Sequence, residues 1–248
     1  QSISLLDLAS NDYLGLSKHP SLINAAQTIM NTDGVGSGAS RLVTGSRPIH
    51  KKLEAALANW LGQDSVLLFP SGFQANIAAV NALADRNTIV ISDRLIHHSL
   101  LVGVRSSGAK LKRFAHNDLN DLERLLKTTQ NDPSPKKRLV LTESLFSMEG
   151  TSPSLEEMGS LCEEYGAQLL VDEAHSIGIL GPKGRGLCYK LSSPVSIISG
   201  TFGKAFGSGG AFLAGNKNMI DHLLQTSGAF RYSTAIAPAL AAAALAAL

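Results

Sequence analysis

Short apolar runs rich in Val, Ile and Leu recur along this chain, and they constrain its fold more than any other feature of the sequence. Within each run the apolar residues are continuous rather than alternating, which is typical of strands covered on both faces. Helical patterns lie between most of the runs, and this order predicts an α/β fold, an α/β/α sandwich with a mostly parallel central sheet. The expected strands span residues 66–69, 88–92, 139–143, 168–172, 195–199 and 211–214, and the expected helices span residues 48–61, 72–83, 98–106, 119–127 and 155–165.

Composition excludes several classes of protein. The chain has 248 residues, of which 44% are hydrophobic, so it can bury a substantial core and is not disordered. A formal net charge of +2 lacks the basic excess of a protein whose main role is to hold nucleic acid. Only 17% of the residues are charged, a low fraction that favours an oligomer with covered surfaces.

The two cysteines, Cys162 and Cys188, have no zinc-binding spacing, so we expect no metal site and a reducing compartment. No apolar stretch reaches the roughly 18 residues of a membrane span. The sequence therefore predicts a cytoplasmic protein that does not act at a membrane.

Polar or glycine-containing turns follow several of the expected strands. The carboxyl ends of parallel strands meet at one edge of a sheet, where ligands bind in open α/β folds. Residues from Ser71 to Lys204 would then share one site, so we expect residues 1–248 to form one large domain. Residues 128–138 are expected to form a loop. Residues 235–248 form an alanine-rich helical run without a polar stop signal, from which we expect the chain to belong to a longer one.

The sequence VDEAH at residues 171–175 invites a second interpretation, because nucleic-acid helicases also end a strand in Asp-Glu-Ala-His. Such ATPases need the phosphate loop G-x-x-x-x-G-K-[ST]. The only Gly-Lys pair lies in GTFGKAF at residues 200–206, where alanine follows the lysine and the loop is too short. GVGSGAS at residues 34–40 likewise has the wrong spacing and context for a dinucleotide-binding loop. The helicase interpretation fails on the missing phosphate loop, and a dinucleotide-binding fold is disfavoured.

What remains is an acid at a strand end, a histidine three residues on, and a lysine in a glycine-rich segment: Asp172, His175 and Lys204. A lysine can form a Schiff base with an aldehyde, and an aspartate can keep a pyridine nitrogen protonated. These are the requirements of a pyridoxal 5′-phosphate (PLP) site. The segment FPSGFQAN at residues 69–76 reads as strand, turn and helix start, and its free N–H groups suit a phosphate, with Gly72 allowing close approach.

A series of motifs along nearly the whole chain carries a family resemblance. In order, they are SNDYLGL, GSGASRLVTGSRPIHKKLE, FPSGFQAN, DRLIHHSL, TESLFSMEG, LVDEAHSIGILGPKGRG and SGTFGKAFGSGGAFLAGN. The chain resembles the α-oxoamine synthases of the fold-type I PLP enzymes. The nearest resemblance is to the branch that condenses L-alanine with a pimeloyl thioester, on coenzyme A or an acyl carrier protein, in biotin biosynthesis. The resemblance also implies a homodimer.

The resemblance assigns roles to single residues. Lys204 would carry the cofactor and later act as base and acid at the substrate Cα, Asp172 would pair with the pyridine nitrogen, and His97 would stack on the ring and contact substrate. The remaining cofactor contacts implied by the family are Gly72, Phe73 and Thr201 at the phosphate, Ala174 under the ring, Ser147 and His175 near the ring hydroxyl, and Ser233 and Thr234 toward the neighbouring subunit. Asn11 would lie near the amino-acid carboxylate.

Alternatives stay open on these residues. The same site would suit glycine with another acyl-CoA, as in the 2-amino-3-oxobutyrate CoA ligase or 5-aminolevulinate synthase type. The family also continues into a small C-terminal domain, which we expect this chain to lack. The chain would then be a PLP-binding large domain, with part of the N-terminal segment, that is inactive alone.

Overall fold

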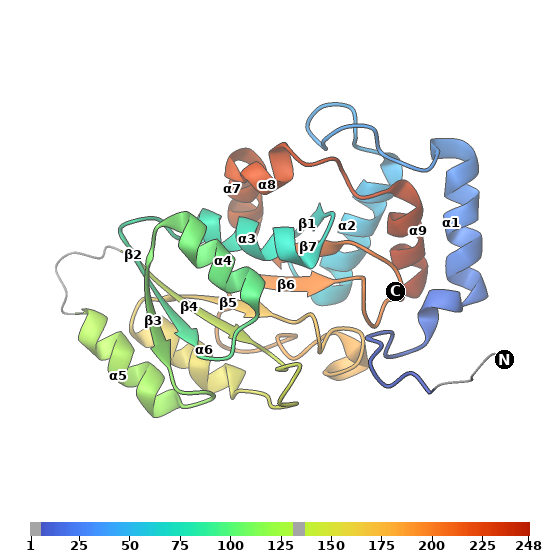
Figure 1. Ribbon diagram of the computed structural model, residues 1–248. Helices are drawn as coiled ribbons and strands as arrows, with labels where there is room; N and C mark the ends of the chain where they lie inside the picture. Colours follow the sequence, from blue (N-terminus) through green and yellow to red (C-terminus); the bar gives the residue numbers. More distant parts are fainter. Residues whose placement is uncertain (1–5, 131–136) are drawn as a thin grey trace.

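The computed structural model describes residues 6–130 and 137–248 and shows a central sheet between layers of helices (Figure 1). The 7-stranded sheet has the order β1-β7-β6-β5-β4-β2-β3. β7 pairs antiparallel with β1 and β6, and the other pairs are parallel, so every strand except β7 runs in one direction. The predicted sandwich is confirmed. The strands are β1 (Ser65–Phe69), β2 (Thr88–Asp93), β3 (Lys110–Phe114), β4 (Lys137–Glu143), β5 (Gln168–Asp172), β6 (Ile197–Thr201) and β7 (Ala211–Gly215).

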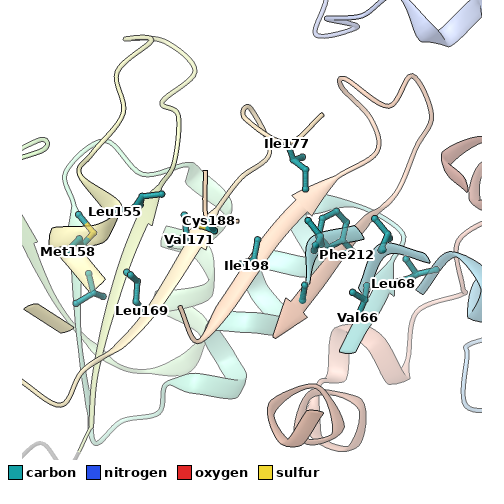
Figure 2. Close-up of a cluster of buried hydrophobic side chains, with 14 of the residues drawn as sticks. Val66, Leu68, Leu155, Met158, Leu169, Val171, Ile177, Cys188, Ile198 and Phe212 are labelled. Carbon is teal, nitrogen blue, oxygen red and sulfur yellow. The ribbon is translucent and has the colours of Figure 1, made fainter. Parts of the chain in front are cut away.

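Both faces of the sheet are buried, as the continuous apolar runs predict. On β1, Val66 and Leu68 join one hydrophobic cluster, whereas Leu67 and Phe69 join the cluster on the opposite face. Figure 2 shows Val66 and Leu68 in the first cluster near Phe212 of β7, while Leu155 and Met158 of the α6 helix (Leu155–Glu164) lie at the other end of the same cluster. Every strand except the edge strand β3 thus divides its side chains between two cores.

The helices divide between the same two clusters. The first cluster takes α6 with α2 (Pro48–Leu61), α5 (Leu119–Gln130) and α9 (Pro238–Ala247). The second takes α3 (Gly72–Leu83), α4 (His98–Ser107), α7 (Lys217–Thr226) and α8 (Gly228–Arg231). Helix α1 (Pro20–Asp33) packs against α9 (Figure 1), and short 3-10 helices span Leu16–Lys18 and Pro182–Gly184. Among the helices of the described ranges, none combines the length and apolar character that a membrane crossing requires.

Several expected boundaries were wrong. Strand β6 lies two residues later than expected, and the strand β3 was missed because its sequence, KLKRF, is charged and mostly exposed at the sheet edge. The expected loop at residues 128–138 is shorter, since α5 continues to Gln130 and β4 begins at Lys137. Its residues 131–136 lie outside the described residues. Helices α1, α7 and α8 were also missed; α1 buries only Leu22 among its side chains, so its apolar face is weakly marked.

A glycine on β6 is covered by an aromatic ring on the adjacent strand. Gly200 is the register partner of Phe212 on β7. A Cβ built on Gly200 would lie 2.4 Å from Cζ of Phe212, so the ring occupies the space a side chain would need. Phe212 is fully buried and its ring centroid lies 5.5 Å from that of Phe202. The ring therefore cannot move aside without disturbing the first cluster.

We predict that Gly200→Ala destabilises the fold by about 1–3 kcal/mol, because overpacking a well-filled core forces side chains off their preferred positions. Urea unfolding followed by circular dichroism measures the change. Gly36→Ala is the matched control, because a Cβ at exposed Gly36 meets nothing within 4 Å. Equal unfolding midpoints for the two variants would contradict the packing of Phe212 on Gly200.

Candidate active site

A cavity of about 190 Å³ lies at the edge of the sheet where the parallel strands end. Its walls come from the ends of β4, β5 and β6, from the start of α3 after β1, from the residue before α4 and from the turn after β6. Residues distant in sequence therefore meet there, as expected for an open α/β sheet. The lining residues are Gly72, Phe73, Asn76, His97, Glu143, Asp172, Ala174, His175, Ser199, Gly200, Thr201 and Lys204.

The carboxylate of Asp172 is held by a buried polar network. The amide of Asn76 donates to Asp172 Oδ2 at 2.7 Å, and the backbone N–H of Ala174 donates to Oδ1 at 2.9 Å. The Oδ1 atom of Asn76 accepts from the Ser199 hydroxyl at 2.6 Å. Asn76 and Asp172 are only 3% and 5% exposed. Leaving either side chain without hydrogen-bond partners would therefore destabilise the folded state. The network fixes the direction in which Asp172 faces the cavity.

The same network extends to His97. The amide of Asn76 also donates to Ser99 Oγ at 2.9 Å, and Ser99 Oγ lies 2.7 Å from His97 Nδ1. His97 is the N-cap of α4 and lines the cavity, whereas the adjacent His98 lies outside the lining with its ring centroid 6.5 Å from that of Phe73. Of the two neighbouring histidines, the structure thus places only His97 on the cavity lining.

Lys204 and His175 contact each other on the cavity lining. Lys204 Nζ lies 2.5 Å from His175 Nε2. Burial lowers the pKa of Lys204, although the carboxyl groups of Asp172 and Glu143 act in the opposite direction. Burial and the nearby lysine lower the pKa of His175 to about 4, so this imidazole is neutral at neutral pH. A lysine with a depressed pKa has more of the free amine that attacks a carbonyl group.

A second buried carboxyl group lies beside Asp172. Glu143 ends β4 and is the register partner of Asp172 at the end of β5. It is 4% exposed, and burial together with the adjacent Asp172 raises its pKa to about 8. Two neighbouring carboxyl groups do not both ionise readily, so Glu143 keeps its proton at neutral pH.

The start of α3 presents backbone donors to the cavity. Ser71 caps the helix, its hydroxyl accepting from the N–H of Gln74 at 3.3 Å and its carbonyl from the N–H of Ala75 at 3.0 Å. Gly72 and Phe73, the first two residues of the helix, line the cavity. Their backbone N–H groups have no partner within the helix, and together with the helix dipole they favour an anion. Thr201 lines the facing wall.

Some of the predicted residues lie away from the cavity lining. Ser147 is exposed in the turn between β4 and α6, and Ser233 and Thr234 lie between α8 and α9. Ser233 Oγ accepts from the side-chain amide of Gln74 at 3.3 Å. Asn11 is exposed, and its Oδ1 accepts from the hydroxyl of Tyr13 at 3.1 Å. The roles of these residues stay predictions.

Sequence reasoning missed four polar residues of this region: Asn76, Glu143, Ser199 and Tyr13. The first and second stood inside motifs already singled out, FPSGFQAN and TESLFSMEG, so their side chains could have been considered. Glu143 in particular ends an expected strand, which is the signal used for Asp172. Ser199 likewise ends an expected strand, residues 195–199, and Tyr13 stands in the motif SNDYLGL, but neither side chain was considered for the site.

Known proteins resemble this chain along nearly all its length. The 8-amino-7-oxononanoate synthase of Photobacterium profundum is 46% identical over 242 residues, which are 97% of this chain and 62% of that relative. Serine palmitoyltransferase from S. paucimobilis, solved as a lysine-to-alanine variant with a PLP–myriocin aldimine, matches with a TM-score of 0.90 and 30% identity over 96% of this chain and 61% of that one. The 8-amino-7-oxononanoate synthase of Francisella tularensis matches with a TM-score of 0.81 and 29% identity over 98% of this chain and 68% of that one.

These likenesses agree with the resemblance carried by the motifs. The chain spans less than two thirds of the length of the curated relative from Photobacterium profundum. The family model for aminotransferase class I and II matches residues 3–248. Because that match covers almost every residue, the chain belongs to the aminotransferase class I and II family.

Proposed function

We propose that this chain binds PLP through Lys204 and belongs to an enzyme that condenses L-alanine with a pimeloyl thioester to give 8-amino-7-oxononanoate. The observation that carries the proposal is the meeting of Asp172, His175 and Lys204 on one cavity, next to the start of α3. The identity of 46% to an 8-amino-7-oxononanoate synthase supports the choice of reaction.

The residues around the cavity fit PLP in charge and hydrogen bonding. Asp172 is a fixed acceptor, held by Asn76 and the Ala174 N–H, and such a group can keep a pyridine nitrogen protonated. The N–H groups of Gly72 and Phe73 suit a phosphate dianion, and the Thr201 hydroxyl would join them by turning from the Gly210 carbonyl, to which it donates at 3.0 Å. Lys204 is the amine nearest these groups on the lining. Groups that suit the pyridine nitrogen, the phosphate and the aldehyde of PLP thus line one cavity.

PLP, when bound, supplies an aldehyde for the lysine amine and a pyridine ring that takes up electrons from the substrate Cα. Lys204 would link to that aldehyde, yield to the amino group of the substrate, and then remove and return a proton at Cα. His97 would cover one face of the ring and Ala174 the other. His175 and Ser147 would bind the ring hydroxyl, and Asn11 would lie near the substrate carboxylate.

The proposed condensation balances as two replacements, one at the thioester carbonyl and one at the alanine Cα. The Cα of L-alanine, having lost its proton, bonds to the thioester carbonyl carbon, and the thiolate of coenzyme A or the carrier protein leaves and takes up a proton. The carboxylate of alanine then departs as carbon dioxide, and a proton takes its place at Cα. A homodimer would let Ser233 and Thr234 of one subunit reach the phosphate site of its partner.

Two further candidates remain worth testing. The fold likeness to a serine palmitoyltransferase, with a TM-score of 0.90, favours including L-serine beside glycine as an alternative amino acid. The span of 62% of a curated relative favours including a unit that binds PLP but is inactive alone.

We predict that the chain, supplied with PLP, gains a visible absorption band and that borohydride reduction fixes the cofactor mass on Lys204. Lys204→Ala should abolish the covalent trapping while leaving noncovalent binding through Asp172 and the start of α3. Absorbance and peptide mass mapping measure both effects. Lys217→Ala, at an exposed lysine paired with Asp221, is the control and should behave as wild type. Equal trapping in the Lys204→Ala variant would overturn the assignment of this lysine.

For the substrate, we predict that L-alanine perturbs the PLP spectrum at lower concentration than glycine or L-serine. Adding pimeloyl-CoA should then release free thiol and carbon dioxide. Spectral titration and a thiol-release assay with the same preparation measure the two steps. A response to glycine or L-serine alone would reject the choice of L-alanine. A response to L-alanine without thiol release would support the unit that is inactive alone.

We predict that, without PLP, the free energy of unfolding of Glu143→Gln increases relative to that of wild type as the pH rises. The pKa of Glu143 is raised from 4.5 to about 8, so between these values the folded state keeps a proton that the unfolded state releases. This group therefore lowers the stability of wild type with rising pH, by up to about 1.4 kcal/mol per pH unit. Glutamine has no such loss.

Urea unfolding across this pH window measures the difference between the variant and wild type. Glu149→Gln, at an exposed glutamate, should follow wild type at every pH. Parallel stability profiles for Glu143→Gln and wild type would show that the Glu143 carboxyl titrates normally in the folded chain.

A further inference from the structure

A tyrosine from the N-terminal segment reaches the cavity through a hydrogen bond to His175. The hydroxyl of Tyr13 lies 2.7 Å from His175 Nδ1, although 162 positions separate the two residues in sequence. On the other side of the imidazole, Nε2 lies 2.5 Å from Lys204 Nζ. The Tyr13 hydroxyl also donates to Asn11 Oδ1 at 3.1 Å. Asn11, Tyr13, His175 and Lys204 thus form one hydrogen-bonded chain.

The protons available to these four side chains fix which group donates and which accepts in each hydrogen bond. A phenol has one proton, and the Oδ1 atom of Asn11 can only accept, so Tyr13 donates to Asn11 and must accept at its own oxygen. His175 therefore donates to Tyr13 from Nδ1. A neutral imidazole carries a single N–H, so Nε2 is left as a bare acceptor toward Lys204.

The surroundings keep these protonation states at neutral pH. Burial and the nearby Lys204 lower the pKa of His175 to about 4, although Asp172 acts in the opposite direction. Burial raises the pKa of Tyr13, so its hydroxyl keeps its proton. Tyr13 and His175 are then both neutral, as the counting of protons requires.

The N-terminal segment is seated on the loop that carries Lys204. Gly207 of that loop has a φ of +60, and a Cβ built there would lie 2.4 Å from the backbone N of Ser17. Asp12 accepts from the same Ser17 N–H at 3.3 Å, which closes the turn around Tyr13. The position of Tyr13 is therefore set by backbone packing against the lysine loop, in addition to its own hydrogen bonds.

We propose that Tyr13 is a positioning residue that holds His175 in the tautomer with the proton on Nδ1, so that Nε2 is a hydrogen-bond acceptor facing the cavity. In the free chain this acceptor binds the Lys204 amine. The consequence for the cofactor rests on the proposed function: the same nitrogen would accept from the ring hydroxyl of PLP. Without Tyr13 the imidazole could carry its proton on Nε2 and would then offer a donor there.

The tautomer can be read without any cofactor. In chain labelled with 15N-histidine, nitrogen chemical shifts and long-range proton couplings distinguish a protonated Nδ1 from a protonated Nε2. We expect His175, assigned by its absence in His175→Asn, to carry its proton on Nδ1 near neutral pH. Tyr13→Phe should move the proton toward Nε2. Tyr232→Phe, at a tyrosine that is 82% exposed, should leave the spectrum of His175 unchanged.

A second measurement links the tautomer to PLP. Loss of one hydrogen bond acting through His175 should weaken PLP binding in Tyr13→Phe by roughly tenfold. A His175 proton on Nε2 in wild type, or an unchanged tautomer in Tyr13→Phe, would overturn the inference whatever PLP does. A tautomer that moves as expected in a chain that binds no PLP would instead support the inference and refute the proposed function.

Discussion

The rest of the site depends on the buried side-chain amide of Asn76. It donates to Asp172 and Ser99 and accepts from Ser199, so one side chain of α3 joins the ends of β5 and β6 to the start of α4. A buried amide or carboxylate without hydrogen-bond partners would lower the stability of the fold by roughly 1–7 kcal/mol. The same bonds that orient Asp172 therefore also help hold α3 and α4 against the sheet, and site geometry and fold stability share one network.

Topology then brings Lys204 to that network. Strand β7 returns antiparallel beside β6, so residues 202–210 connect them as a hairpin loop and not as a helical crossover. Inside the loop, Phe202 N–H donates to the Gly210 carbonyl and Ser208 N–H donates to the Phe202 carbonyl, both at 2.9 Å. The ring of Phe212 over Gly200 keeps the two strands close at the same point. Lys204 therefore extends from a backbone that is fixed on both sides.

The sequence was sufficient to predict helices and strands that have strong local patterns. It was less informative for elements and contacts that depend on tertiary packing. Helices α2 and α3 were predicted to the residue because each carries a clear start signal and a continuous apolar face. Strand β3 could not be predicted from its charged sequence, because pairing with β2 is what orders it. In the site, Asp172 and Lys204 stood out from their motifs. Tyr13 did not, since its meeting with His175 depends on how the N-terminal segment packs against Gly207.

The protonation states of the residues around the cavity suit the proposed binding of a protonated pyridine ring. Glu143 and Asp172 end adjacent strands in register, yet burial and the adjacent Asp172 keep the proton on Glu143, with a pKa of about 8. His175 stays neutral because its pKa is about 4. Asp172 beside it faces the cavity as an acceptor fixed by two donors, the Asn76 amide and the Ala174 N–H. A protonated pyridine nitrogen placed there would pair with a single, oriented acceptor, while the neutral groups around it would add hydrogen bonds without competing for the charge.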